Sequence, residues 1–500
     1  QMAEPAGTNT TGSVVLLPVS EHLGFPLDQV NFVVCQLLGL TAAFWFRLHL
    51  RPSRFSPLAR HAVATAFGVA ILIFCFGWYS AHVLVLVTAC YLIMVFADVN
   101  NVHKYSLVAA MGYLTACQVC RAYIFSYAVP STDFSGPLMI VTQKITTLAF
   151  QLHDGKAAKC DQLTAEQKLV AITARPSLLE YLSYNLNFLS ILVGPCSNYR
   201  DYLDFIEGGH IRRRLRPPAS ACNGHKRPRR GPEPDLEPGP GPEPSPLSAV
   251  CQKLLVCCGC VLFFLLVTRS LPIKANGDAA FVRQNSFLVR LTYAFFSIQA
   301  ARPKFYFAWM LASEAIHNAA GYGFSGMDEK GKPRWDLIRN LDILGVETAT
   351  SFKTFIDNWN IQTAVWLKAV CYDRAPHRLA LTFILSALWH GVLPGYYFTF
   401  ITAIPITMAA RAIRKSLRHY FLRSRGLKLG YDVVTWASTQ LAICYTVMPF
   451  LLLSVESTFI YYRSMYFHVH IISILVAVAL KPQHKSSKAS SSSSPSAMCP

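Results

Sequence analysis

The sequence predicts an all-α, polytopic transmembrane helical bundle of about 11 spans around an internal chamber. Of the 500 residues, 53% are hydrophobic and only 15% are charged, whereas roughly 25% are charged in an average soluble domain. A water-soluble chain of this length needs more polar surface to cover its core. The surplus apolar residues are therefore expected to face lipid.

The net charge of +19 favours a membrane protein with basic loops over a nucleic-acid-binding protein. The Lys and Arg residues lie between apolar runs, where positive charge is typical of loops that face the cytosol. We therefore expect membrane lipid, and no nucleic acid, as a partner. Several of the 15 cysteines lie inside apolar runs, which suits small buried hydrophobes better than disulfides.

A bilayer core of about 30 Å needs roughly 20 apolar residues in each spanning helix. The first such stretch, near 30–50, lacks a small-residue cleavage site and is expected to stay as an anchor. Lys144 and Arg121 lie within apolar runs, which indicates segments that are re-entrant or line an internal cavity. The candidate spans cover residues 30–48, 61–77, 80–98, 104–128, 134–152, 180–194, 248–269, 284–300, 304–321, 378–393, 395–411, 431–454 and 457–480.

Polar segments divide the chain. Residues 209–247 combine an Arg/Lys cluster with the run GPEPDLEPGPGPEPSP, which buries too little apolar surface to fold. An inert cytosolic linker is favoured there over a site for partners or anionic headgroups. The predicted parts are a lumenal tail (1–29), a transmembrane part (30–208), a disordered Arg/Pro-rich cytosolic insert (209–247), a second transmembrane part with the candidate catalytic residues (248–480) and a disordered cytosolic tail (481–500).

The distribution of Lys and Arg predicts the topology. The basic loop at 411–428 and the basic tail after residue 480 are separated by two candidate spans, so both are placed in the cytosol. The Arg-rich loop at 47–60 is also cytosolic by this rule. One span precedes it, which places the N-terminus in the lumen. The sequon at Asn9 falls on that side and is a glycosylation candidate.

His390 is the strongest chemical signal. It lies in the motif Leu-Trp-His-Gly at 388–391, inside an apolar run and ahead of Pro-Gly-Tyr-Tyr at 394–397. An ionisable residue at membrane depth is a functional candidate. Burial favours the neutral imidazole, which can accept a proton as a general base. Taken alone, however, a single histidine on an apolar helix is more often a packing residue.

Asn360 is the second signal. It lies in Asp-Asn-Trp-Asn-Ile-Gln-Thr at 357–363, which opens a stretch with apolar residues at helical spacing. Taken alone, its amide is more often an interhelical hydrogen-bonding group than a catalytic one.

These motifs together resemble the membrane-bound O-acyltransferase family, in its lysophospholipid acyltransferase branch. The resemblance rests on the Trp-Asn pair at 359–360, on Trp-His-Gly about thirty residues later and on the following Pro-Gly-Tyr-Tyr. It extends over residues 25–480 and includes the segments 133–150, 194–208 and 306–326. The resemblance implies that His390 and Asn360 are the paired catalytic residues of the family.

The implied reaction transfers an acyl chain from acyl-CoA, as co-substrate, to the glycerol hydroxyl of a lysophospholipid. His390 takes the proton of that hydroxyl, and Asn360 orients the imidazole, holds the hydroxyl or donates to the oxyanion. The resemblance also implies ethanolamine or serine headgroups, an oleoyl donor and phospholipid remodelling at the endoplasmic reticulum. The sequence shows no GxSxG motif, so direct transfer is favoured over an acyl-enzyme.

Acyl-CoA requires a basic entrance and an apolar tunnel. The candidate substrate-binding residues are Lys353, Lys368, Tyr306, Trp309 and Trp359. For the lysines, ordinary loop charge is favoured over contact with CoA phosphates, and the aromatics are as consistent with packing as with a tunnel lining.

Other readings stay open. The same fold could acylate a sterol, a diacylglycerol or a protein, and a transporter with a gating histidine is less favoured because no internal repeat is visible. We expect no cofactor and no metal site, since His468 and His470 lie two apart on a predicted helix and point to different faces. The oligomeric state is not readable from the sequence.

Overall fold

The computed structural model describes residues 10–124, 132–157, 163–215 and 243–480. Across these ranges the chain is mostly helical, with nearly no strand, which confirms the all-α prediction. Their one sheet is a two-residue antiparallel pair in which β1 (Gly326–Met327) faces β2 (Pro333–Arg334).

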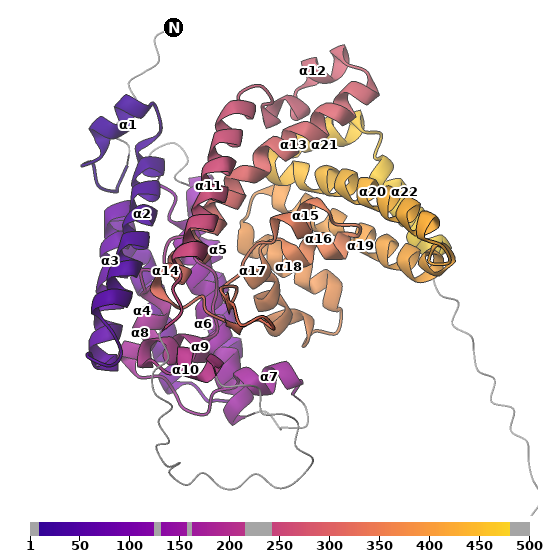
Figure 1. The fold of residues 1–500 in the computed structure, drawn as a ribbon. Helices are drawn as coiled ribbons and strands as arrows, with labels where there is room; N and C mark the ends of the chain where they lie inside the picture. Colours follow the sequence, from indigo (N-terminus) through magenta and orange to yellow (C-terminus); the bar gives the residue numbers. More distant parts are fainter. Residues whose placement is uncertain (1–9, 125–131, 158–162, 216–242, 481–500) are drawn as a thin grey trace, which may run out of the picture.

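The first part of the chain forms the indigo-to-magenta group in Figure 1. Its elements are α1 (Leu17–Leu23), α2 (Leu27–His49), α3 (Pro57–Phe76), η1 (Gly77–Tyr79), α4 (Ser80–Phe96), α5 (Val102–Val119), η2 (Cys120–Ile124), α6 (Ser135–Lys156), α7 (Ala165–Val170), α8 (Leu178–Leu186), α9 (Tyr199–Glu207) and α10 (His210–Leu215).

The second part forms the pink-to-yellow group in Figure 1. Its elements are α11 (Leu247–Val267), η4 (Ile273–Gly277), α12 (Ala279–Gln284), α13 (Phe287–Trp309), η5 (Met310–Ala315), α14 (Ile316–Ala320), α15 (Ile343–Glu347), α16 (Phe352–Asn358), α17 (Ile361–Leu367), η6 (Lys368–Tyr372), α18 (Arg378–His390), α19 (Pro394–Phe421), α20 (Arg425–Leu452), α21 (Val455–Ser464) and α22 (His468–Ala479).

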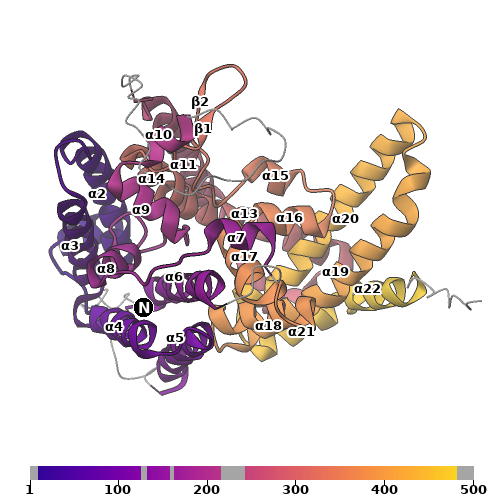
Figure 2. The same cartoon turned by 90° about the horizontal axis from the view of Figure 1, so that it is seen from below.

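Helix α6 is buried around most of its circumference. In Figure 2 it lies between α5 and α17, where the two parts of the chain meet. Its polar residues are buried together with its apolar ones, among them Thr142, Gln143 and Lys144. Lys144 is fully buried and donates to the carbonyl of Tyr184, at 2.9 Å, and to the hydroxyl of Ser190. This confirms that the segment faces protein rather than lipid.

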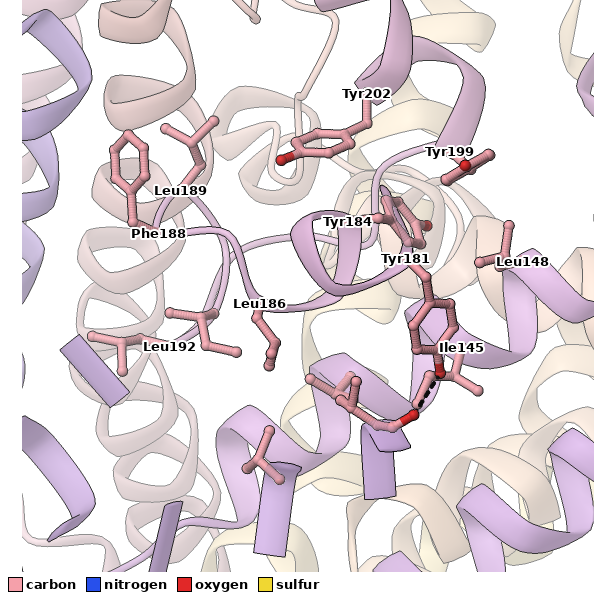
Figure 3. Packing of buried hydrophobic residues seen from close by; sticks show 14 of the residues in the cluster. Ile145, Leu148, Tyr181, Tyr184, Leu186, Phe188, Leu189, Leu192, Tyr199 and Tyr202 are labelled. Atoms are coloured by element: carbon pink, nitrogen blue, oxygen red, sulfur yellow. Dashed lines mark hydrogen bonds between the residues drawn. The ribbon is translucent and has the colours of Figure 1, made fainter. Parts of the chain in front are cut away.

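The chain after α8 is irregular and deeply buried. Figure 3 shows Leu186, Phe188, Leu189 and Leu192 packed with the tyrosines of α8 and α9 over α6. Irregular backbone is tolerated away from water when it is buried in protein. The Lys144 ammonium joins the two parts of this segment, because it donates to the Tyr184 carbonyl near the end of α8 and to the Ser190 hydroxyl beyond it. The predicted span at 180–194 is therefore wrong, because α8 has only nine residues and the chain then turns inside the protein.

The predicted break between spans 284–300 and 304–321 is also wrong. Helix α13 continues through Pro303, and the π-turn η5 and α14 follow it without interruption. Proline removes one backbone donor and normally kinks a helix, but Pro303 is buried within the bundle and the helix persists around it. Packing within the bundle thus keeps α13 helical at a proline that would normally interrupt it.

Five helical segments of the described chain are long and apolar enough to cross a membrane, or six if the bent pair α21–α22 is one span. These helices support a multi-pass membrane protein, but they do not support the predicted number of about 11 spans. Two predicted spans, α6 and α8, pack inside the protein, and α18 has only 13 residues. One apolar segment, Pro57–Phe96, runs through α3, η1 and α4 and has 40 residues.

Two boundaries differ from the predicted parts. Helix α1 lies within the predicted tail at 1–29, and α10 covers residues at the start of the predicted insert. The α10 residues are ordered by ion pairs of Arg213 with Asp204 and of Arg214 with Asp201. The glycosylation candidate Asn9, most of the insert and the tail at 481–500 lie outside the described residues.

Gly68 gives a stability test of the α3–α8 contact. A Cβ at Gly68 would overlap the carbonyl group of Leu186, whereas a Cβ at Gly112 in α5 would meet no atom within 4 Å. We expect Gly68→Ala to destabilise the protein by about 3 kcal/mol and Gly112→Ala to be neutral or stabilising through helix propensity. Thermal unfolding of the purified protein in detergent measures both, and equal melting temperatures for the two variants would contradict the packing described.

Candidate active site

His390 is the last residue of α18. The chain turns at Gly391, where a Cβ would meet the ring of Tyr396 at 2.6 Å, and then enters α19 at Pro394. The histidine therefore projects at the junction of two helices instead of from the middle of one.

Aromatic rings from α19 and α20 surround the imidazole. Phe400 is stacked on it with a centroid distance of 5.3 Å, Phe450 meets it edge to face at 5.0 Å, and Tyr396 lies at 5.9 Å. No described residue hydrogen-bonds the imidazole, and neither ring nitrogen is among the fully buried polar atoms that lack a partner. The ring is thus held by apolar contacts while its nitrogens stay available for chemistry.

Trp389 fixes the end of α18 against α6 and α5. Its side chain is buried, and its indole N–H donates to the carbonyl of Met139 at 3.0 Å. Its own carbonyl accepts from the amide of Gln118 at 3.2 Å. These two hydrogen bonds set the position of the neighbouring His390.

Asn360 begins α17 in a left-handed conformation, with φ 50° and ψ 55°. Asparagine tolerates this region better than most residues with a Cβ. Its Oδ1 accepts from the hydroxyl of Thr363 at 2.9 Å, and that hydroxyl accepts from the amide of Gln143 at 2.9 Å. The side-chain hydrogen bond of Asn360 to the described residues uses Oδ1, which leaves the Nδ2 group as a free donor with respect to them.

Helix α6 relates Asn360 to His390. Along it, Met139 receives Trp389, Gln143 donates to Thr363, and Thr146 accepts from the indole of Trp366 at 2.8 Å. The two helices therefore run in the same direction at this contact. Asn360, the residue before α17, lies toward the Met139 end of α6, where α18 docks. Four residues of helix span about 6 Å, so the structure brings both predicted residues to one stretch of α6.

The three predicted aromatics form one cluster beside Asn360. The ring of Trp359 meets those of Trp309 at 5.1 Å and Tyr306 at 5.9 Å, and it stacks on Phe355 at 5.8 Å. Trp359 and Asn360 are consecutive, so the cluster adjoins the candidate site directly.

The two predicted lysines lie apart from this cluster. Lys353 is exposed and pairs with Asp357 one turn later, and Lys368 is exposed and pairs with Glu166 at 2.6 Å. Arg374, which also follows Asn360 in sequence, forms a two-bonded ion pair with Asp154 at 2.6 and 3.0 Å.

Sequence reasoning missed the polar groups that hold the site together. Gln143 anchors the Asn360 segment, and Arg302 pairs with Glu347 at 3.0 Å beneath Tyr306, whose hydroxyl also donates to Glu347. The available signal was the presence of Gln143 and Arg302 in largely apolar runs, but their partners lie far away in the chain.

His468 and His470 have separate hydrogen bonds. His470 contacts the hydroxyls of Thr402 and Tyr445, at 2.9 and 2.7 Å, whereas His468 contacts the carbonyl of Met465 at 2.7 Å. They do not converge on a common point.

An apolar groove of about 500 Å³ opens between α5 and α18. Helix α5 contributes residues one turn apart along a single face, which Cys120 of η2 continues, and α18 contributes Leu388, which lies two residues before His390 and thus on another face of the helix. The lining residues are Met111, Gly112, Thr115, Ala116, Val119, Cys120 and Leu388. Such a surface suits an acyl chain better than a polar solute.

Comparison with known proteins agrees with the resemblance carried by the sequence motifs. The sequence model of the membrane-bound O-acyltransferase family matches residues 78–452, which include Asn360 and His390. The chain is 57% identical to human membrane-bound glycerophospholipid O-acyltransferase 1, with 95% of this chain and 94% of that protein covered. It is 52% identical to chicken membrane-bound glycerophospholipid O-acyltransferase 2 (96% and 91% covered) and 37% identical to lysophospholipid acyltransferase 6 of Drosophila melanogaster (94% and 64% covered).

The left-handed backbone of Asn360 gives a test by paired substitutions. Alanine is strained in this conformation and glycine is not, so we expect Asn360→Ala to be less stable than Asn360→Gly by about 1 kcal/mol. Asn358 is the control, because it ends the regular helix α16, where alanine is preferred to glycine. Thermal unfolding of the four variants should give opposite orders at the two positions; the same order at both would contradict the geometry.

Proposed function

Because this chain belongs to the membrane-bound O-acyltransferase family and is an acyltransferase, we propose that it moves a fatty acyl chain from acyl-CoA to the free glycerol hydroxyl of a lysophospholipid. The observation that carries the proposal is the imidazole of His390, which has no hydrogen bond to a described residue and is held in an aromatic enclosure within the matched region. The names of the fly and vertebrate relatives support a glycerophospholipid acceptor.

In the proposed reaction, a neutral His390 accepts the proton of the acceptor hydroxyl. The hydroxyl oxygen then forms a bond to the thioester carbonyl carbon, and the tetrahedral intermediate collapses as the carbon–sulfur bond breaks. The CoA thiolate leaves and takes the proton from the imidazolium, so the histidine returns to its starting state. General base catalysis of this kind contributes roughly 10²–10⁴-fold.

For Asn360, we propose a donor role. Its Oδ1 is already engaged by Thr363, so the free Nδ2 is the group that can reach a substrate. A donor aimed at the thioester oxygen stabilises the charge that develops in the transition state. The left-handed backbone and the Thr363–Gln143 chain hold this donor in place before substrate binds.

The surrounding surfaces suit two amphiphilic substrates. We propose that the cluster of Tyr306, Trp309 and Trp359 contacts one acyl chain and that the groove between α5 and α18 admits a second chain from the membrane. Holding both reactants in register contributes further rate enhancement through orientation.

The finer details of the proposal come from the resemblance in sequence. They are ethanolamine or serine headgroups, an oleoyl donor and a multi-pass location in the endoplasmic reticulum membrane. The N-terminus would be lumenal, with Asn9 as a glycosylation candidate, and the basic C-terminus cytosolic.

The assay of choice offers oleoyl-CoA and a panel of lysolipids, sterol, diacylglycerol and peptide to the purified protein. We expect His390→Ala to lower acyl transfer to lysophospholipid by at least about 100-fold, and Asn360→Ala by a factor of roughly 100, without loss of the folded state. His377→Ala is the matched control, since His377 caps the other end of the same helix and is exposed. Acylation of sterol or peptide without acylation of any lysolipid would refute the proposed acceptor.

The lysines give a separate kinetic test. We propose that Lys353 and Lys368 exchange their exposed carboxylate partners for CoA phosphates, which costs little because exposed ion pairs contribute at most about 1 kcal/mol. Lys353→Gln and Lys368→Gln should each raise KM for acyl-CoA a few-fold, roughly the effect of one surface charge, while kcat stays constant. Lys330→Gln, on the exposed β1–β2 hairpin, is the control. An unchanged KM for acyl-CoA in both variants would refute contact with CoA phosphates and leave these lysines as ordinary charged loop residues.

A further inference from the structure

A small basic pocket lies away from the His390 site, where the turn between α2 and α3 meets α9, α10 and the end of α14. These elements come from both parts of the chain, and α9, α10 and α14 are adjacent in Figure 2. The pocket has a volume of about 50 Å³. Its charged lining residues are Arg47, Arg51, Arg60 and Glu243, and the wall is completed by Pro52, Phe205, Gly208, His210, Ile211, Ala320 and Gly321.

Arg60 is the most deeply buried cation of this pocket, with an exposed fraction of 3%. Its Nη1 donates to the last carbonyls of α9, those of Phe205 at 3.3 Å and Ile206 at 2.7 Å. Its Nε is fully buried and has no acceptor among the described residues. One edge of the guanidinium therefore caps a helix while the other lacks a partner, although buried donors are nearly always paired.

Arg47 has the same feature. Its Nη2 donates to the carbonyl of Pro244 at 2.9 Å and lies 3.7 Å from the carboxylate of Glu243. Its Nε is buried and also has no acceptor in the described part of the chain. With Arg51, the pocket thus holds three guanidinium groups, two unpaired N–H donors and a single, loosely placed carboxylate.

Neighbouring groups do not neutralise this charge. On α9, Asp201 pairs with Arg214 at 3.0 Å and Asp204 pairs with Arg213. His210 is buried, and burial together with the adjacent Arg214 lowers its pKa to about 4, so it is neutral at physiological pH. Accumulated positive charge in a half-enclosed space is favourable only when an anion is present.

The backbone leaves room for such an anion. Gly208 and Gly321 both have positive φ, at 85° and 87°, and end α9 and α14 at the pocket wall. A Cβ at Gly321 would lie 3.4 Å from Nε of Arg47. Because both residues are glycines, no side chain from these two helix ends fills the pocket.

We propose that this pocket binds a phosphate monoester group. When no such group is bound, the Glu243 carboxylate takes its place beside Arg47. Arginine forks match phosphate oxygens in geometry and charge. A volume of about 50 Å³ accommodates one such group but no nucleotide. The same chemistry is offered by free phosphate and by the headgroup of an anionic lipid such as phosphatidate, and the site is independent of acyl transfer at His390.

The test measures thermal stabilisation of the full-length protein in detergent by inorganic phosphate, relative to chloride at equal ionic strength. A ligand that binds only the native state raises the melting temperature with its concentration. Arg47→Gln and Arg51→Gln should each raise the apparent dissociation constant roughly tenfold, because each removes a charged donor. Glu243→Gln should lower it several-fold, roughly in line with loss of a competing ion pair. Arg54→Gln is the control, as an exposed arginine of the same turn outside the pocket.

A second arm uses nanodiscs of phosphatidylcholine with and without phosphatidate. Stabilisation that appears only with phosphatidate and depends on Arg47 supports the site and assigns it to a lipid headgroup; stabilisation by phosphate in detergent assigns it to soluble phosphate. The proposal is overturned if Arg47→Gln and Arg54→Gln respond alike in both arms, or if Glu243→Gln leaves the apparent affinity unchanged. The Glu243 variant keeps the test decisive even if an arginine variant folds poorly.

Discussion

The hydrogen bonds between α6 and the helices α17 and α18 are the interaction on which the candidate site depends. Three polar contacts along α6, at Met139, Gln143 and Thr146, receive or anchor Trp389, Thr363 and Trp366. In an environment poor in water, a buried polar group has few alternative partners, so each contact is strongly directional. The candidate residues His390 and Asn360 are thus positioned from the first part of the chain, although both belong to the second.

Much of the fold could be predicted from composition and apolar periodicity. The long apolar helices α2, α3, α5, α11 and α19 follow the predicted segments. The prediction failed where an apolar run is buried in protein and not in lipid. Residues 180–194 have the composition of a span, but the chain turns there inside the protein, where Lys144 donates to the Tyr184 carbonyl and the Ser190 hydroxyl. At Pro303 the helical signal was interrupted, yet packing keeps α13 continuous.

In the candidate site, too, some features could be predicted from the sequence and others could not. His390 and Asn360 were identified because a local motif surrounds each of them. The supporting contacts could not be foreseen, since Gln143 and Thr363 are 220 residues apart and Met139 and Trp389 are 250 apart. Nor does a sequence show that Lys368 pairs with Glu166, which lies 202 residues away. Short motifs identify the candidate catalytic residues. Their positions depend on hydrogen bonds between residues far apart in the sequence, which the sequence alone does not show.

The walls around His390 come from helices other than its own. Phe400 and Phe450 belong to α19 and α20, while the histidine is fixed to α6 and α5 through Trp389. The enclosure of the imidazole and the position of its backbone are therefore set by different helices. A substitution at Phe450 would change the surroundings of the ring and leave both hydrogen bonds of Trp389 in place.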